Sequence, residues 1–328
     1  MIQILKLIRY KNLLFLALTQ YAMHQFVVVP LLQKFGFEYF EAGISLWLLL
    51  VASVSIAAAG YAINDYFDVK IDRINRPTKI LVGETISKQQ AMLLHQVLTG
   101  IGVVCGLVLA YLVQSFTVAF LFLVIPGLLW FYSASYKRQF LTGNLVVALN
   151  AGLSVLVVAI VAIADLNSEF ADLIFRTTIP AEIYTWVGGF AVFAFAFTLI
   201  REIVKDLQDV EGDREMECRT MAIVWGAKKT KLFLFALLAI ACALMWYVVL
   251  KEIPFEGSLT MKYSFFGITL PLFVFSYLLI KAQHPIAYAQ LSTLLKYCML
   301  IGLLYSLMFN YLLASKFEFP MFNLFLIK

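Results

Sequence analysis

Apolar segments of about 20 residues recur along the whole chain, and they constrain its fold more than any other feature. A helix needs roughly that length to cross the hydrocarbon core of a bilayer. Of the 328 residues, 62% are hydrophobic and only 14% are charged, whereas soluble domains have about 25% charged residues. The sequence therefore predicts an all-α polytopic membrane protein, with one membrane-embedded domain over residues 1–328. We expect about nine spans, at residues 13–32, 43–63, 89–113, 116–134, 143–164, 183–203, 231–250, 264–281 and 291–314.

The distribution of basic residues predicts the orientation in the membrane. Cytoplasmic loops collect Lys and Arg, and most of the 25 Lys and Arg residues fall on one side if the N-terminus is cytoplasmic. An odd number of spans then places the C-terminus outside. The long irregular stretches, near 64–88 and 204–230, would both face the cytoplasm. Nucleic-acid binding would need a basic face on a folded surface, which we do not find, and no obligate protein partner is evident.

An acidic cluster follows the second predicted span, in the stretch NDYFDVKIDRINR. At about 100° of rotation per helical residue, its amide and three carboxylates fall within about 100° of one another, while Lys70 points away. Like charges on one helix face repel, so a cation is expected to compensate them. Oxygen ligands suit Mg²⁺, which typically takes one or two carboxylates together with substrate phosphates. These four residues are Asn64, Asp65, Asp68 and Asp72.

A second acidic cluster follows the sixth predicted span. Asp206, Asp209 and Asp213, with Glu202, fall within about 60° around a helix, although Gly212 is expected to loosen or end that helix. Either cluster alone could be a solvated loop with weak surface ion pairs. Two one-sided clusters at the cytoplasmic ends of spans instead favour a diphosphate bridged by Mg²⁺.

The two clusters resemble the signatures of a known family. NDYFDVKID matches N-D-x-x-D-x-x-x-D, the first signature of the UbiA superfamily of intramembrane prenyltransferases, and KDLQDVEGD resembles its second, D-x-x-D-x-x-x-D. YSASYKRQFLTGN, at residues 132–144, resembles the family's tyrosine and lysine motif as found in the digeranylgeranylglyceryl phosphate synthase branch. The sequence departs from the family in the spacing of Tyr132 and Lys137, five rather than four, and at Glu217 and Met221-Ala222, where relatives often have Gly and Leu-Pro.

The resemblance implies nine helices around a central cavity. It also implies transfer of a prenyl group from a prenyl diphosphate, with geranylgeranyl diphosphate as the expected donor, through an allylic carbocation with release of pyrophosphate. It implies Mg²⁺ held by Asn64, Asp65, Asp68, Asp72, Asp206, Asp209 and Asp213. The catalytic residues would be Asp68, Asp72, Asp209, Asp213 and Lys137. The substrate would also contact Arg76, Tyr132, Arg138 and Lys205.

The acceptor stays open between two classes. A glycerol-phosphate lipid hydroxyl suits the Lys137-Arg138 pair, because basic side chains bind phosphate; an aromatic ring, as in quinone, haem or chlorophyll pathways, is the alternative. Intramembrane Gln20 and Asn150 could contact the acceptor, but helix–helix hydrogen bonds explain both. A transporter of an anionic solute is the alternative from another class, although transporters bind near the bilayer midplane and these charges cluster at one face.

Overall fold

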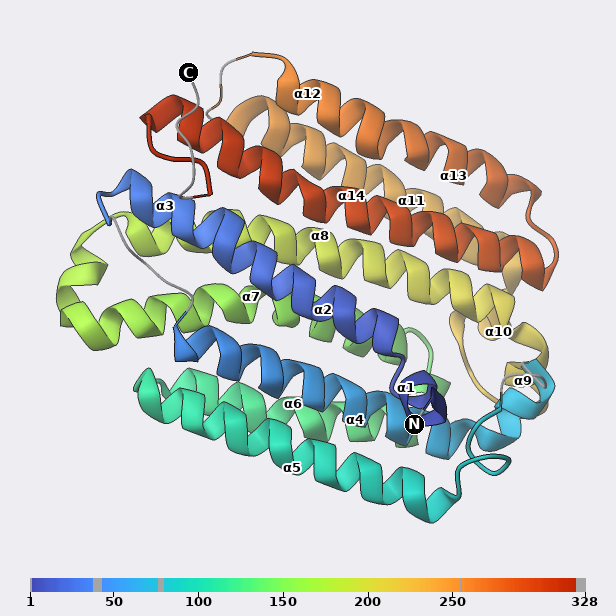
Figure 1. The fold of residues 1–328 in the computed structure, drawn as a ribbon. Coiled ribbons are helices and arrows are strands. Elements are labelled where there is room, and N and C mark those ends of the chain that lie inside the picture. Colours follow the sequence, from blue (N-terminus) through green and yellow to red (C-terminus); the bar gives the residue numbers. More distant parts are fainter. Residues whose placement is uncertain (1, 38–42, 76–79, 254, 256, 323–328) are drawn as a thin grey trace. The chain divides into compact units, whose positions relative to one another are not determined.

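The computed structural model describes residues 2–37, 43–75, 80–253, 255 and 257–322, and within these ranges the regular structure is helical (Figure 1). The described residues include nine helical segments that are long and apolar enough to cross a membrane. The prediction of an all-α polytopic fold is therefore confirmed. The segments are Tyr10–Lys34, Ile44–Asn75, Lys88–Leu112, Phe116–Ala134, Thr142–Phe170, Ile179–Gln208, Gly226–Glu252, Leu259–Lys281 and Pro285–Phe317.

The chain divides into two compact units. The first comprises Met1–Lys137 and Leu153–Ala191, and the second comprises Arg138–Gly152 and Val192–Lys328. Two long helices, α7 (Thr142–Phe170) and α8 (Ile179–Gln208), each contribute residues to both units. The first acidic motif belongs to the first unit and the second motif belongs to the second unit.

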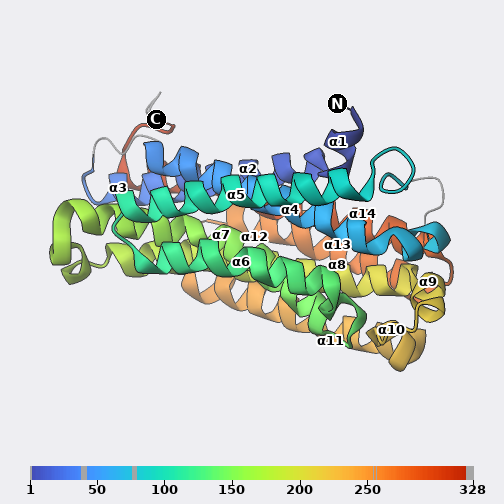
Figure 2. The same ribbon diagram turned by 90° about the horizontal axis from the view of Figure 1, so that it is seen from below.

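The first unit is built around α4, which packs against α2, α5 and α6. Figure 2 shows α5 and α6 running side by side as a helical hairpin. A π-helical turn, His24–Val28, joins α2 to α3 within one span. The α-helices that lie wholly within this unit are α1 (Ile2–Leu7), α2 (Tyr10–Met23), α3 (Val29–Lys34), α4 (Ile44–Asn75), α5 (Lys88–Leu112) and α6 (Phe116–Ala134).

Local sequence explains how this hairpin begins and why it packs closely. Ser87 forms a capping box with Gln90 at the start of α5, and the Ser115 side chain accepts a hydrogen bond at the start of α6, which satisfies amides that have no partner within the helix. Gly102 lies against α4: a Cβ there would be 2.5 Å from a side-chain carbon of Ile56. Small residues of this kind let membrane helices approach each other.

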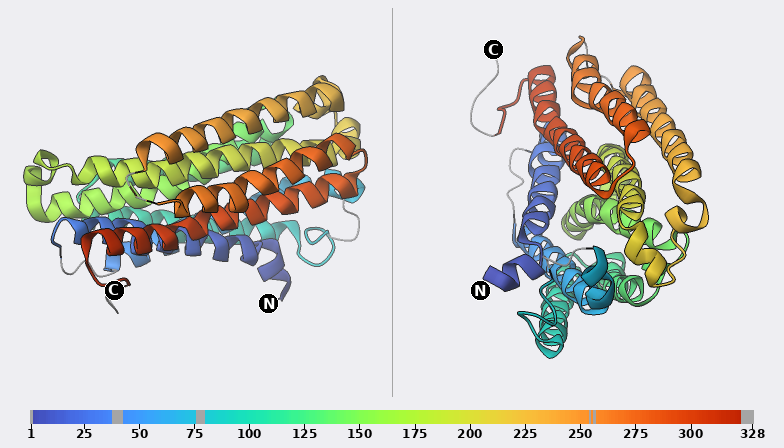
Figure 3. Two further views of the ribbon diagram at one scale, coloured as in Figure 1. Left: turned by 90° about the horizontal axis from the view of Figure 1, so that it is seen from above. Right: turned by 90° about the vertical axis from the view of Figure 1, so that its right-hand side faces the viewer.

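The second unit packs the end of α8 with the C-terminal helices around a core that contains Phe275, Leu234 and Leu295. Figure 3 shows α13 and α14, in orange and red, lying side by side. One π-helical turn, Val248–Glu252, extends the span that α11 begins, and another, Ser264–Thr269, joins α12 to α13 within one span. The remaining helices are α9 (Val210–Glu215), α10 (Met221–Val224), α11 (Gly226–Tyr247), α12 (Leu259–Tyr263), α13 (Leu270–Lys281) and α14 (Pro285–Phe317).

The expectation that residues from 64 onward are irregular is wrong. Helix α4 continues to Asn75. The sequence contains neither Gly nor Pro between Gly60 and Pro77, so nothing interrupts the helix, and the residue before a proline is biased away from helical geometry. The second span and the first acidic motif are therefore one rigid element.

Candidate active site

The first motif occupies the last three turns of α4, so its polar side chains project from one helix. Asn64, Asp65 and Asp68 are partly buried there. The separation of Asn64, Asp68 and Asp72 by four residues places them on one face, as the sequence predicted. Arg76, which we expected to contact the substrate, lies outside the described residues.

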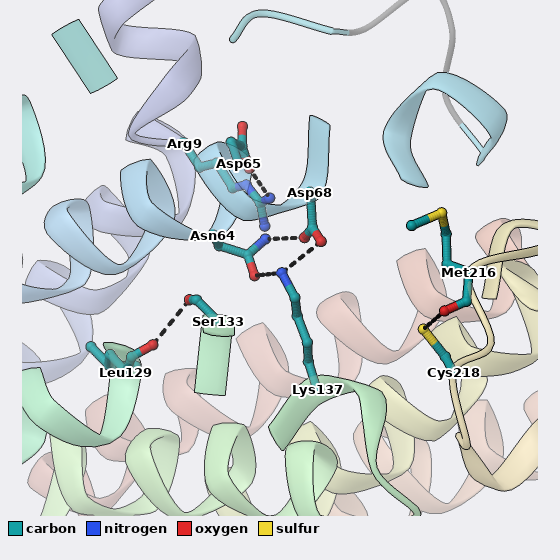
Figure 4. Close-up of polar contacts among 9 residues, drawn as sticks. All are labelled: Arg9, Asn64, Asp65, Asp68, Leu129, Ser133, Lys137, Met216 and Cys218. Carbon is teal, nitrogen blue, oxygen red and sulfur yellow. Dashed lines mark hydrogen bonds and ion pairs between the residues drawn. The ribbon is translucent and has the colours of Figure 1, made fainter. Parts of the chain in front are cut away.

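Asp68 contacts both Asn64 of the same motif and Lys137. Its Oδ1 atom lies 2.6 Å from Nζ of Lys137, and its Oδ2 atom accepts a hydrogen bond from Nδ2 of Asn64 at 2.9 Å. The same ammonium group is 3.4 Å from Oδ1 of Asn64. Figure 4 shows the three side chains pointing toward one another. Only 12% of the Lys137 side chain and 15% of the Asp68 side chain are exposed, so this pair is shielded from water.

Lys137 reaches the motif because α6 ends beside α4. Leu129 of α6 packs so closely on Gly60 that a Cβ at this glycine would lie 3.1 Å from the leucine. Two turns further along α4, Phe67 lies within the first motif. Its ring contacts the indole ring of Trp130 of α6, with 5.7 Å between ring centroids. Lys137 then follows in a short 3₁₀ turn, Tyr136–Arg138. Lys137 thus lies beside Asn64 and Asp68, and its role in the site stays a prediction.

The first motif has a second basic partner, Arg9, which the sequence reasoning missed. Nη2 of Arg9 donates a hydrogen bond to Oδ1 of Asp65 at 2.8 Å, and the guanidinium lies 4.9 Å from the ring centroid of Tyr61. Partial burial disfavours the charge of Arg9, but Asp65, Tyr61 and Tyr132 together raise the pKa of Arg9 above its usual value. The predicted site residue Tyr132 thus contributes to the electrostatic environment of Arg9.

The second motif spans a short break between two helices. Helix α8 ends at Gln208 and α9 begins at Val210, with Asp209 between them. The break thus falls at Asp209, whereas Gly212, where we expected the helix to loosen, lies inside α9. The amides of Asp209 and Asp213 still donate to carbonyl oxygens four residues earlier, at 2.9 and 3.1 Å, so the helical register is nearly continuous.

Two neutral side chains hold the carboxylates of the second motif. Nδ2 of Asn144, from the start of α7, donates to Oδ2 of Asp206 at 2.9 Å. The hydroxyl of Thr220 donates to Oδ2 of the buried Asp213 at 3.2 Å. Neither Asn144 nor Thr220 was predicted. Asn144 closes the YSASYKRQFLTGN stretch, and this was the available signal for its role.

Two basic residues of the second unit, Lys205 and Arg138, were predicted to contact the substrate. Glu202 forms ion pairs with Arg201 and Lys205, at 2.7 and 2.6 Å, so Lys205 lies on α8 beside a carboxylate. The side chain of Arg138 is exposed, and its carbonyl oxygen accepts a hydrogen bond from the amide of Arg219 at 2.7 Å. This backbone bond ties the start of the α7 segment to the loop before α10.

The donor set fits Mg²⁺ only as a partial ligand shell. Among the described residues, no three His, Cys, Asp or Glu side chains gather closely enough to hold a metal ion. The oxygens of Asn64 and Asp68 that flank the Lys137 ammonium nevertheless show that a cation can lie between them. One or two carboxylates completed by phosphate oxygens is the usual way in which proteins bind Mg²⁺.

The fold and the site define an α-helical, multi-pass integral membrane protein with two Asp-rich motifs at the ends of two spans. The chain belongs to the UbiA prenyltransferase family, whose model matches residues 36–290. The predicted family is thereby confirmed.

Curated relatives of this chain share one name. The chain is 34% identical over 203 residues to a digeranylgeranylglyceryl phosphate synthase of Ignicoccus hospitalis, covering 62% of this chain and 60% of the relative. It is 30% identical over 255 residues to the enzyme of the same name from Korarchaeum cryptofilum, covering 76% of this chain and 80% of the relative. The matched part thus spans about 60% of the first relative's length.

Solved structures share the fold. A structure described as digeranylgeranylglyceryl phosphate synthase in membranes is 23% identical, with a TM-score of 0.61, and the match covers 93% of this chain and 96% of the other. A UbiA homologue from Archaeoglobus fulgidus bound to GPP and Mg²⁺ is 15% identical, with a TM-score of 0.55, and covers 92% and 98%. At these identities the likeness concerns the fold.

Proposed function

We propose that this protein is a Mg²⁺-dependent prenyltransferase that moves a geranylgeranyl group from geranylgeranyl diphosphate to the hydroxyl of a glycerol-phosphate lipid. The observation that carries the proposal is the convergence of Lys137 on Asn64 and Asp68. It brings the tyrosine and lysine motif to the first acidic motif, as a diphosphate site requires. The name shared by relatives at 30% identity and above supports the choice of reaction.

The chain's own residues would act on the leaving group. When bound, Mg²⁺ would neutralise the charge that develops on the departing diphosphate. Lys137 would donate hydrogen bonds to the diphosphate oxygens, and charge-assisted bonds of this kind are stronger than neutral ones. Asn64, Asp65, Asp68 and Asp72 of the first motif, and Asp206, Asp209 and Asp213 of the second, would supply oxygen ligands.

The bond changes follow from this arrangement. The bond between C1 of the prenyl chain and the diphosphate oxygen breaks, and the electron pair leaves with pyrophosphate. The acceptor's hydroxyl oxygen then bonds to C1 of the allylic carbocation and releases its proton. Tyr132, Arg138, Lys205 and Arg76 are the remaining candidates for substrate contacts. An apolar site would protect the cation from water.

We also propose an orientation for the protein in the cell membrane. The N-terminus and both acidic motifs would face the cytoplasm, and the C-terminus would lie outside. This follows from the excess of Lys and Arg on one side. It would give the polar head of the substrate access from the cytoplasm while its prenyl chain stays in the bilayer.

A reconstitution assay tests the function directly. Purified protein in lipid nanodiscs would be incubated with geranylgeranyl diphosphate, Mg²⁺ and either geranylgeranylglyceryl phosphate or 4-hydroxybenzoate. We expect a doubly prenylated lipid and equimolar pyrophosphate with the first acceptor, and complete loss of both products in excess EDTA. A prenylated aromatic product instead would show that the acceptor is an aromatic ring. Absence of pyrophosphate with both acceptors would refute the proposed reaction.

A further inference from the structure

Two basic side chains from outside α4 neutralise two carboxylates of the first motif. Arg9 lies at the junction of α1 and α2 and pairs with Asp65 at 2.8 Å, whereas Lys137 lies after α6 and pairs with Asp68 at 2.6 Å. These cations are 56 and 69 residues away from their partners in the sequence. The motif therefore has internal counter-ions that converge from two separate segments of the first unit.

The basic residues of α4 itself do not take this role. Lys70 is exposed, and Arg73 forms only a long ion pair with Glu84, at 3.9 Å, with both side chains more than half exposed. Such pairs contribute little to stability. The contacts to Asp65 and Asp68 are shorter, and the four side chains involved range from 12% to 35% exposed.

The backbone at Arg9 is consistent with a specific placement of its side chain. Arg9 has a φ angle of 53° in the left-handed region, which residues with a Cβ adopt at a cost in free energy. The guanidinium lies over the Tyr61 ring, and the hydroxyl of Tyr61 accepts a hydrogen bond from Nδ2 of Asn12 at 3.3 Å. These contacts keep Arg9 directed at Asp65.

We propose that Arg9 and Lys137 are exchangeable counter-cations, which occupy the first motif until Mg²⁺ and a diphosphate group arrive together. The inference rests on the proposed function and extends it to Arg9. A metal ion alone must displace an arginine or a lysine from its carboxylate and leave that cation without an anion. A diphosphate supplies the missing anion, because its oxygens can accept hydrogen bonds from both displaced side chains.

Coupled binding of metal and diphosphate is the measurable consequence. Each ligand should raise the affinity for the other by the same factor, since coupling between two binding equilibria is reciprocal. Couplings between ligands typically correspond to about 5- to 150-fold changes in affinity. The absence of a three-residue metal cluster among the described residues agrees with a site that the metal cannot complete alone.

Metal binding to the free protein isolates the role of the two cations from catalysis. Mn²⁺ binding to the full-length protein in nanodiscs, without diphosphate, would be measured by electron paramagnetic resonance. Arg9→Asn removes the charge with a residue that tolerates the left-handed backbone, and Lys137→Met removes the other. We expect each variant to bind Mn²⁺ about tenfold more tightly than the wild type, equivalent to about 1.4 kcal/mol.

Matched variants control for net charge and folding. Lys11→Gln and Lys70→Gln remove one charge from the α2 segment and from α4, respectively, at exposed positions, and should leave Mn²⁺ affinity unchanged. Arg9→Lys retains the charge and should behave as the wild type. Equal tightening in Lys11→Gln or Lys70→Gln would reduce the effect to net charge and overturn the proposal, as would unchanged or weaker Mn²⁺ binding in folded Arg9→Asn and Lys137→Met.

The second arm measures the coupling itself. Binding of a radiolabelled, non-hydrolysable geranylgeranyl thiodiphosphate would be compared in EDTA and in Mg²⁺. We expect at least about fivefold tighter binding with Mg²⁺ in the wild type, and a smaller ratio in Arg9→Asn. Equal ratios would overturn the exchange. Because neither arm requires turnover, a protein that shows the exchange but transfers no prenyl group would refute the proposed function alone.

Discussion

Replacing Asp68 with asparagine separates the structural and catalytic roles of the first motif. The substitution preserves side-chain shape and removes the charge that faces Lys137 at 2.6 Å. Hydrogen bonds to charged groups contribute about 1.5–3 kcal/mol to stability, and both side chains are mostly buried. We expect Asp68→Asn to lower the free energy of unfolding by about 2 kcal/mol. It should also reduce kcat by roughly 10²–10³, the usual effect of removing one stabilising group from a developing charge.

The assay combines pyrophosphate release with denaturation in a mild detergent. Glu84→Gln is the matched control, because that carboxylate is 58% exposed and 3.9 Å from Arg73; surface pairs of this kind contribute about 0–1 kcal/mol, so neither stability nor rate should change measurably. If Asp68→Asn lost stability but retained the wild-type kcat, Asp68 would only hold the fold together. If it retained both, the ion pair with Lys137 would have no importance in solution.

Three further substitutions test packing, the membrane interior and the second motif. Gly106→Ala would place a Cβ 2.3 Å from the Phe122 ring and should destabilise the protein by about 1–3 kcal/mol, whereas Gly100→Ala, on the same helix with nothing within 4 Å, should not; equal unfolding midpoints would contradict this. Gln20→Leu should lower the free energy of unfolding by only about 0.6 kcal/mol and leave the KM for the acceptor unchanged. An increased KM would indicate that Gln20 contacts the acceptor. Asp206→Asn should raise stability in EDTA by about 0.5–2 kcal/mol while reducing the transfer rate, and a protein that is less stable and fully active would disprove that expectation.

The spans and the face of the first motif could be predicted from the sequence, because both depend on local periodicity. An apolar run of sufficient length indicates a span wherever it occurs, and helical rotation places Asn64, Asp68 and Asp72 together without knowledge of any neighbour. A helix–helix hydrogen bond was predicted for Gln20, and its amide donates to Ser53 of α4 and to the carbonyl of Ser154 of α7. A helix–helix hydrogen bond was also predicted for Asn150, but its amide donates to the carbonyl of Val146 within α7.

The partners of the carboxylates could not be predicted, because they are distant in the sequence. Arg9 was assigned only to the basic residues that set the orientation. Its left-handed backbone, which aims the guanidinium at Asp65, has no signal in the residues around it. Asn144 reaches Asp206 across 62 residues. We expected the helix to break at Gly212, because glycine has a low helix propensity. The break falls at Asp209 instead, because tertiary context can override propensity in a short helix such as α9.

The contacts of Asp65 and Asp68 in the first motif differ from those of Asp206 in the second, and we expect the two motifs to respond differently to a metal ion. In the first, Asp65 and Asp68 each have a basic partner within 2.8 Å. In the second, Glu202 is paired with Arg201 and Lys205, whereas Asp206 accepts a hydrogen bond from the neutral amide of Asn144. The carboxylates of Asp213, Glu202 and Asp209 disfavour the charge of Asp206. Carboxylates crowded in this way repel one another, so removing the charge of Asp206 should relieve strain in the metal-free protein. The same repulsion favours a bound cation, and the second motif is therefore expected to gain more from Mg²⁺ alone than the first.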